Sequence, residues 1–219
     1  SPGETVAFIG STGSGKSTLI QLIPRFYDVT KGRILIDGFD VRDYNLSSLR
    51  QKIGFIPQKA LLFTGTIADN IRYGKHDASH EEIINASETA QALDFINQKP
   101  DKFGEFLAEG GSNMSGGQKQ RLSIARAIVK RPDIYIFDDS FSALDYQTDV
   151  RLRSALNNIT EDSTVLIVAQ RVSTIMNADK ILVLNEGNVV AEGTHRELLK
   201  TCDIYYDIAS SQLTKEELE

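Results

Sequence analysis

The sequence predicts an α/β fold with a mainly parallel sheet, and three observations lead to that prediction. Short apolar runs alternate with segments of helical periodicity along most of the chain. The apolar runs are continuous, as in strands that helices cover on both faces. The first run, residues 6–9, is followed by a glycine-rich loop and then by a helix-like segment at 19–23. We therefore expect a sheet between helical layers, with a ligand site at the carboxyl ends of its strands.

Composition narrows the class of protein. The chain has 219 residues, of which 41% are hydrophobic and 25% charged, enough for one large domain or two small ones. A net charge of -6 disfavours nucleic acid as a partner. Cys202 is the only cysteine, so no internal disulfide can form. No apolar run approaches the roughly 20 residues that a membrane-spanning helix needs.

The first third of the chain shows clear strand and helix boundaries. Pro24 ends the helix after the loop, an Asp-Gly turn closes the next strand, and Pro57 ends the third. The expected elements are a strand at 5–9, a helix at 16–23, a strand at 32–38, a helix at 46–51 and a strand at 53–56.

From about residue 64 to 130 the pattern becomes helical. Ser79 and Glu82 form an S-x-x-E capping pair at one expected helix start. The helices are expected at 67–71, 81–90, 92–96 and 118–129, which predicts a helical insertion between strands of the core. Alternation then resumes, with strands at 134–137, 164–168, 180–184 and 189–191, a helix near 150–156 and a terminal helix after Thr194.

The glycine-rich loop predicts a phosphate-binding site. Its residues are Gly10, Ser11, Thr12, Gly13, Ser14, Gly15, Lys16, Ser17 and Thr18. The spacing is G-x-x-x-x-G-K-[ST], and it lies between a strand and a helix, as this motif requires. Glycines let backbone N–H groups converge on a polyphosphate, and the following helix presents its N-terminus to the same anion. Lys16 would contact the β- and γ-phosphates, and the Ser17 hydroxyl would bind Mg²⁺.

A second candidate site lies at the end of a buried strand. Asp138 follows the apolar run 134–137, at the sheet edge where open α/β folds bind ligands. Alone, such an Asp is more often a turn or helix cap. With the phosphate loop upstream, we interpret it as a Mg²⁺ ligand that acts through water.

The segment Ser115, Gly116, Gly117 and Gln118 allows two interpretations. Ser115 and Gln118 have capping-box spacing before a helix. A serine and two bare glycines at a helix N-terminus can also form a phosphate site. Since one domain binds one triphosphate, such a second site would serve another subunit. The residues alone leave both interpretations open.

Taken in order, these motifs resemble the nucleotide-binding domain of an ABC transporter, from Ser1 to about Leu213. Residues 10–17 match the Walker A loop, Gln58 the Q-loop glutamine, and 115–118 the signature motif. Residues 134–138 match Walker B, 142–145 the D-loop, and Gln170 occupies the position of the switch histidine. The segments 63–71 and 109–113 resemble the exporter branch.

The resemblance implies a P-loop NTPase (RecA-like) core at about 1–58 and 131–213 and a helical subdomain at about 59–130. It implies ATP and Mg²⁺ as cofactors. Mg²⁺ would be bound by Ser17, Gln58 and Asp138. The nucleotide would be bound by residues 10–18, Gln58 and 115–118. It also implies a membrane-spanning domain on the same longer chain, at the cytoplasmic side of the membrane, and a second nucleotide-binding domain in a head-to-tail dimer. Because Ser1 leads directly into the first strand, we expect the family's first strands and its adenine-stacking aromatic residue to lie upstream.

Two positions depart from the family pattern. The residue after the Walker B aspartate is usually glutamate, the base that polarises the attacking water, but here it is Asp139. A side chain shorter by about 1 Å in reach can cost on the order of 10²-fold in rate. Gln170 can form hydrogen bonds at the switch position but cannot carry a positive charge. With Lys16, these two residues are the expected catalytic set.

Three hypotheses follow. The first is the ATPase domain of a multidrug-type exporter, in the subunit that carries the weakly hydrolysing site of a heterodimer. The second is a competent homodimeric exporter in which Asp139 suffices. The third is a soluble ABC-type ATPase that acts as a structural or regulatory switch. A P-loop kinase would leave the signature motif unexplained.

Overall fold

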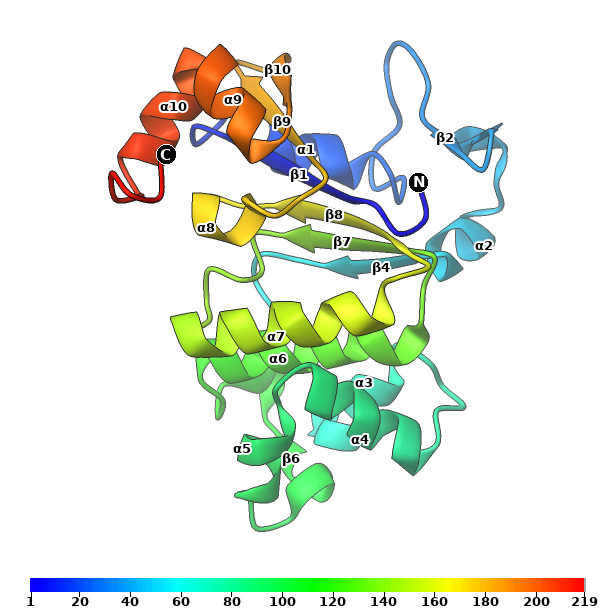
Figure 1. Cartoon of the computed structure of the whole chain (residues 1–219). Coiled ribbons are helices and arrows are strands. Elements are labelled where there is room, and N and C mark those ends of the chain that lie inside the picture. Colours follow the sequence, from blue (N-terminus) through cyan, green and yellow to red (C-terminus); the bar gives the residue numbers. More distant parts are fainter. Residues whose placement is uncertain (219) are drawn as a thin grey trace.

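The computed structural model describes residues 1–218; Glu219, the end of the predicted 1–219 domain, lies outside the described residues. One six-stranded sheet forms the centre of the molecule (Figure 1), in the order β10-β9-β1-β8-β7-β4. Its strands are β1 (Thr5–Gly10), β4 (Ile53–Ile56), β7 (Ile134–Asp138), β8 (Thr164–Val168), β9 (Lys180–Asn185) and β10 (Asn188–Gly193). All neighbours pair in parallel except β10 with β9. The predicted α/β fold with a mainly parallel sheet is confirmed.

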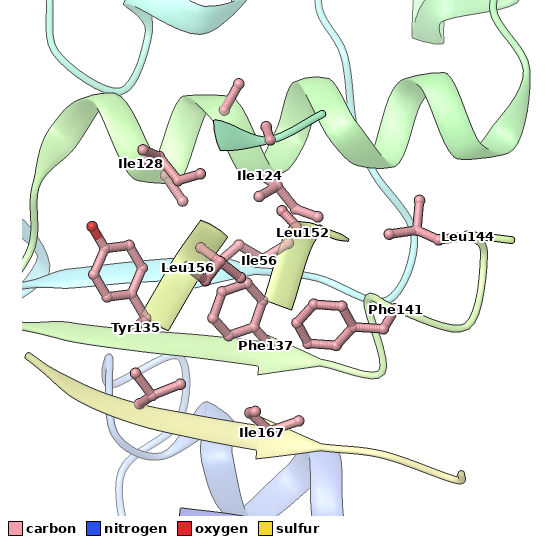
Figure 2. Packing of buried hydrophobic residues seen from close by; sticks show 14 of the residues in the cluster. Ile56, Ile124, Ile128, Tyr135, Phe137, Phe141, Leu144, Leu152, Leu156 and Ile167 are labelled. Carbon is pink, nitrogen blue, oxygen red and sulfur yellow. The ribbon is translucent and has the colours of Figure 1, made fainter. Parts of the chain in front are cut away.

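Helices cover both faces of the sheet, as the continuous apolar strands require. On one face lie α6 (Gly116–Lys130) and α7 (Tyr146–Ile159), seen below the sheet in Figure 1. Figure 2 shows Ile124 and Ile128 of α6 above Tyr135 and Phe137 of β7. On the other face, α1 (Lys16–Gln21) contributes Ile20 to a second cluster that includes Ile136. Alternate residues of β7 thus enter opposite cores, which is why the whole strand is apolar.

The chain between β4 and β7 contains a short antiparallel strand pair and four helices. The pair consists of β5 (Gly65–Thr66) and β6 (Phe106–Leu107), and the helices are α3 (Ile67–Arg72), α4 (His80–Thr89), α5 (Leu93–Asn97) and α6. The predicted helices are found with ends shifted by a few residues. Capping boxes fix the starts of α3, α4 and α6 at Thr66, Ser79 and Ser115. Apolar side chains of α3 and α4 join the same cluster as those of β7, so these helices pack continuously with the sheet.

The prediction of one strand at 32–38 was wrong in its extent. The structure has a separate hairpin of β2 (Leu35–Ile36) and β3 (Phe39–Asp40), outside the main sheet. The predicted Asp-Gly turn is present, and Asp37 and Gly38 have φ of 52° and 83°. Two consecutive positive φ values make the tight reversal that joins adjacent antiparallel strands, so the strand ends where the turn begins.

Other elements differ in length or were not predicted. α7 begins at Tyr146 rather than near 150 because the Asp145 side chain accepts a hydrogen bond from the Thr148 amide. Helices α2 (Leu46–Gln51) and α9 (His195–Thr201) were expected, whereas α8 (Val172–Ile175) and α10 (Asp203–Ser210) were not. Short 3₁₀ turns span Val41–Asp43, Lys102–Gly104 and Glu109–Gly111. Within residues 1–218, we find no helix with the length and apolarity required to cross a membrane.

Candidate functional site

The glycine-rich loop joins β1, near the centre of the sheet, to α1. A Cβ at Gly10 would lie 2.1 Å from the carbonyl oxygen of Leu184 on β9, so only glycine allows the loop to leave the sheet here. Gly13 and Gly15 have φ of 81° and 94°, in the left-handed region. The loop therefore turns without side chains at these points, and its backbone amides line an open surface suited to an anion.

The Lys16 side chain folds back over this loop. Its Nζ donates to the carbonyl oxygens of Gly10 and Ser11, at 2.7 and 2.8 Å, and to Ser14 Oγ at 3.2 Å. Burial lowers the pKa of Lys16, against the opposing effect of the Asp139 and Asp138 carboxylates. The Lys16 ammonium group therefore lies within the loop, where it can bind a phosphate group.

Ser17 and Asp138 meet although 121 positions separate them in sequence. The Ser17 hydroxyl donates to Asp138 Oδ1 at 2.7 Å. Asp138 ends β7 and is 4% exposed. Because β1 and β7 run in the same direction, the start of α1 and the end of β7 lie at one edge of the sheet. A hydroxyl and a carboxylate side by side are oxygen ligands of the kind that Mg²⁺ prefers.

Asp139 is held on two sides by glutamine amides. Gln58 Nε2 donates to its Oδ2 at 3.0 Å, and Gln170 Nε2 donates to the same oxygen at 2.7 Å. Burial raises the pKa of Asp139, partly offset by these two hydrogen bonds. The residue has a φ of 47°, in the left-handed region that few residues other than Gly, Asn and Asp adopt, and its amide donates to the carbonyl of Val168. Such strain is common where a fold positions a functional side chain.

Two further glutamines support this arrangement, and sequence reasoning missed their roles. Gln120 is 2% exposed on α6, and its Nε2 donates to the carbonyl oxygen of Pro57 at 3.0 Å, next to Gln58. Gln212 donates to the carbonyl of Gln170 at 2.9 Å and accepts from the amide of Val172 at 2.8 Å. An amide on the apolar side of α6 was a usable signal for Gln120. No local signal marks Gln212.

The segment Ser115–Gln118 stands apart from the loop. Ser115 Oγ accepts from the Gln118 amide at 3.3 Å, and Gln118 Oε1 accepts from the Ser115 amide at 3.0 Å, so the predicted capping box is present. Ser115 and Gly116 are exposed. Among residues 1–218, no hydrogen bond joins this segment to the glycine-rich loop, Asp138 or Asp139. The chain thus leaves the amino end of α6 open on its surface.

The family comparison agrees with this geometry. Residues 1–142 match the family model for the ABC transporter. The chain belongs to the ABC transporter family. This match covers well over half of the chain and includes the loop, the Ser115–Gln118 segment and the Asp138–Asp139 pair.

Curated relatives extend the ABC match to almost the whole chain. An "Uncharacterized ABC transporter ATP-binding protein" of Mycobacterium tuberculosis is 47% identical over 214 residues, which are 96% of this chain and 36% of that protein. A "Putative multidrug export ATP-binding/permease protein" of Staphylococcus aureus is 49% identical over 210 residues, 96% of this chain and 36% of that protein. The chain therefore spans little more than a third of the length of these relatives.

A solved structure shows the same ABC domain fold. A bacterial Atm1-family ABC exporter with ATP bound superposes with a TM-score of 0.94 at 40% identity, over 97% of this chain and 38% of that chain. This confirms the P-loop NTPase fold, and the chain is an ATP-binding domain of the ABC type, a class of ATPase domain.

The fold brings together most of the residues that the sequence singled out. The Walker A residues Lys16 and Ser17, the Walker B Asp138, and Asp139 with its partners Gln58 and Gln170 form one connected group. The exposed loop residues Ser11, Thr12 and Thr18 flank it. Gln58 contacts Asp139 rather than Asp138 or Ser17 in this structure. The signature segment 115–118 does not join the group.

Proposed function

We propose that this domain binds Mg-ATP at the group formed by the glycine-rich loop, Lys16, Ser17 and Asp138. The loop has no side chain at Gly10, where a Cβ would clash, and the buried ammonium group of Lys16 lies against the loop. These residues therefore fit a polyphosphate. The Ser17–Asp138 oxygen pair fits Mg²⁺, and in this proposal the amide oxygen of Gln58, whose Nε2 is bound to the neighbouring Asp139, is a further ligand. Bound Mg²⁺ would neutralise phosphate charge, and Lys16 would bind the β- and γ-phosphates.

We further propose that hydrolysis at this site is slow. Asp139 is the residue placed to accept a proton from attacking water, because it is buried and has a raised pKa. One of its oxygens, however, is already bound by two amide groups, and its side chain is one methylene shorter than glutamate. Gln170 supplies no positive charge toward a phosphate. Each feature weakens base catalysis or charge stabilisation in the transition state.

The open amino end of α6 supports a dimer. Ser115–Gln118 presents a capped helix start and two glycines, and within residues 1–218 no hydrogen bond joins it to the glycine-rich loop, as expected of a segment that completes the nucleotide site of a second domain. We propose a head-to-tail pair in which this chain lends its signature to a partner with a competent site. Its own retained ATP would then favour the closed pair.

The proposed whole protein is an exporter with a membrane domain on the same longer chain, placing this domain at the cytoplasmic side of the membrane. The name of the Staphylococcus relative includes both ATP-binding and permease parts, which supports this over a soluble regulatory ATPase. A groove between the sheet and the helices at 59–130 offers a docking surface. Exposed aromatic and aliphatic side chains flank it, among them Leu61, Phe63 and Tyr73, which are 59%, 40% and 58% exposed.

One observation favours the alternative of a competent homodimeric exporter. Asp139 is not displaced or exposed but firmly oriented by Gln58 and Gln170, as a working base would be. If Gln58 and Gln170 reorient on ATP binding and release the Asp139 carboxylate, its shorter reach is the only respect in which it is a weaker base than glutamate.

The deciding experiment measures Mg-ATP binding and steady-state turnover of the full-length protein, alone and with a candidate partner subunit. Asp139→Glu with Gln170→His is run beside it, and Asp138→Asn serves as a control in which turnover at this chain's own site should be lost. We expect tight binding with negligible turnover alone, turnover that appears when the partner is added, and a rise on the order of 10²-fold in the double variant for the rate at this chain's own site. Brisk turnover of the unmodified protein alone, unchanged by the double substitution, would instead establish the homodimer.

A further inference from the structure

A second cavity lies at the opposite edge of the sheet from the nucleotide loop. Its volume is about 330 Å³, at the lower end for small-molecule sites. It is formed where α6 ends and β7 begins, between α4 and the last turn of α7, on the right-hand side of these elements in Figure 1. Neither the ATP site nor the signature segment contributes to it.

The hydroxyl of a buried tyrosine faces this cavity. Tyr135 is 2% exposed and its ring stacks beside Phe137, with centroids 6.3 Å apart. Its hydroxyl points away from Phe137 toward the end of α6 (Figure 2), on the side where the cavity lies. No residue in the described part of the chain forms a hydrogen bond with it. Burial raises the pKa of Tyr135 to about 12, so at neutral pH the hydroxyl keeps its proton and can donate it.

The unpaired charge at the cavity is positive. Arg131 is the C-cap of α6, with a left-handed φ of 51°. Its charge adds to the lowering of the Glu82 pKa, which the hydrogen bond from Lys75 mainly causes, and it opposes the rise that burial gives the pKa of Tyr135. Within residues 1–218, no carboxylate lies at salt-bridge distance from Arg131. Glu82 is already bound, by Lys75 Nζ at 2.6 Å and the Ser79 amide at 2.9 Å.

Apart from Asn85, Thr89 and Ser163, the remaining walls are apolar. Ile128 and Val129 of α6 are buried, and Ile159 at the end of α7 is 40% exposed at the rim. An occupant would therefore place an apolar body against the apolar side chains and an anionic group near Arg131 and the Tyr135 hydroxyl. A hydrogen bond from a cation to an anion is of the strong, charge-assisted kind.

We propose that this cavity is a binding site for a small organic anion, an apolar and preferably planar molecule that carries one carboxylate. The site is independent of the nucleotide site, because the two lie at opposite ends of β7, which begins at Ile134 and ends at Asp138. The inference does not rest on the proposed function.

The test uses phenylacetate as the probe and phenylacetamide as its neutral counterpart. Methyl NMR of the isoleucine-labelled 219-residue chain follows Ile128 and Ile159 at the cavity, with Ile36 in the other core as the reference. We expect saturable shifts at Ile128 and Ile159 only, with a Kd of about 1 mM for so small a probe, unchanged when Mg-ATP is present. Phenylacetamide should bind roughly tenfold more weakly than phenylacetate. For phenylacetate, Arg131→Gln should weaken binding roughly tenfold, Arg131→Lys by less, and Tyr135→Phe roughly fivefold.

A matched pair of tyrosine variants tests the free hydroxyl without any ligand. Tyr44 Oη donates to the carbonyl of Ile36 at 2.9 Å, so Tyr44→Phe loses a hydrogen bond and should lower the Tm. Tyr135→Phe loses none and should leave the Tm unchanged or raise it. Shifts that do not saturate, that appear equally at Ile36, or that ignore both Arg131→Gln and Tyr135→Phe would overturn the proposal. So would a Tm loss in Tyr135→Phe as large as that in Tyr44→Phe.

Discussion

The loop between β1 and α1 and the amino end of α6 are both glycine-rich segments that precede a helix, yet the fold treats them differently. The first is tied into the molecule: Lys16 is 8% exposed and bonded to its own loop, and Ser17 reaches Asp138. The second is exposed and bonded only to itself through its capping box. The first segment therefore has the contacts of a phosphate site assembled within one chain, whereas the second lacks them, in keeping with our proposal that a second chain completes its site.

Removal of the Lys16 ammonium group, in the first of the two segments, should have the largest effect. Lys16→Ala deletes the only lysine that contacts the loop carbonyls among the described residues, and charge-assisted bonds to phosphate are lost. We expect the affinity for Mg-ATP to fall at least about 100-fold, roughly 2.7 kcal/mol. Isothermal titration calorimetry measures this, with the exposed Lys31→Ala as the control. A change under about threefold in Lys16→Ala would mean that the backbone alone holds the phosphates.

A negative charge introduced at the amino end of α6 tests whether the two segments have different functions. Nothing lies within 4 Å of a Cβ built at Gly116, so Gly116→Asp fits sterically, and a carboxylate in the first helical turn is favourable for the helix. It should nevertheless repel a triphosphate presented by a partner. We expect an unchanged Tm and unchanged ATP binding by this chain, but a loss of turnover of roughly tenfold or more in the assembled transporter.

Gly116→Ala is the neutral control for that variant and should retain most of the turnover. If Gly116→Asp instead weakens ATP binding to the isolated chain, the amino end of α6 serves its own nucleotide, and the head-to-tail arrangement is wrong.

Loss of the Ser115 cap should have a smaller effect, which is measured on the stability of the chain. Ser115→Ala removes the side-chain acceptor of the Gln118 amide at the start of a 15-residue helix. The free energy of unfolding should fall by about 1 kcal/mol, as for other serine caps. Urea denaturation measures the difference, and Ser112→Ala in the preceding turn should stay within about 0.5 kcal/mol of the unmodified chain. Equal losses in both variants would show that the cap contributes nothing specific.

The smallest effect is a pH-dependent one at Asp139. Burial raises its pKa above the ordinary 3.8, so the folded chain holds this proton more tightly than the unfolded chain does. Ionisation of Asp139 therefore opposes folding increasingly as the pH rises from 3.8 to the folded pKa, and by a constant amount above it. Asp139→Asn keeps an oxygen that accepts from Gln58 and Gln170 and removes the charge.

Near neutral pH, Asp139→Asn should consequently have a higher Tm than the unmodified chain, and the difference should shrink as the pH falls toward 3.8. Differential scanning calorimetry over this range gives the answer. A difference that stays constant with pH would show that folding does not raise the pKa of Asp139.

Several parts of this molecule could be predicted from local sequence because their causes are local. The G-x-x-x-x-G-K-[ST] spacing, the S-x-x-E pair at Ser79 and Glu82 and the apolar runs of the strands each act within a few residues. The errors also have local causes. The strand at 32–38 was predicted too long because its Asp-Gly turn reverses the chain within the run, and α10 lacked an evident start signal, since Cys202 caps it without a side-chain bond.

The sequence by itself determined the fold class, the phosphate loop and the departures at Asp139 and Gln170, since residue types and short spacings decide them. Only the tertiary structure decided that Gln58 and Gln170 converge on one oxygen of Asp139, that Gln120 and Gln212 hold the segments around them, and that the Tyr135 hydroxyl faces a cavity. These contacts join residues dozens of positions apart. Their geometry follows from strand order and from the packing of helices on the sheet, which no short stretch of sequence specifies.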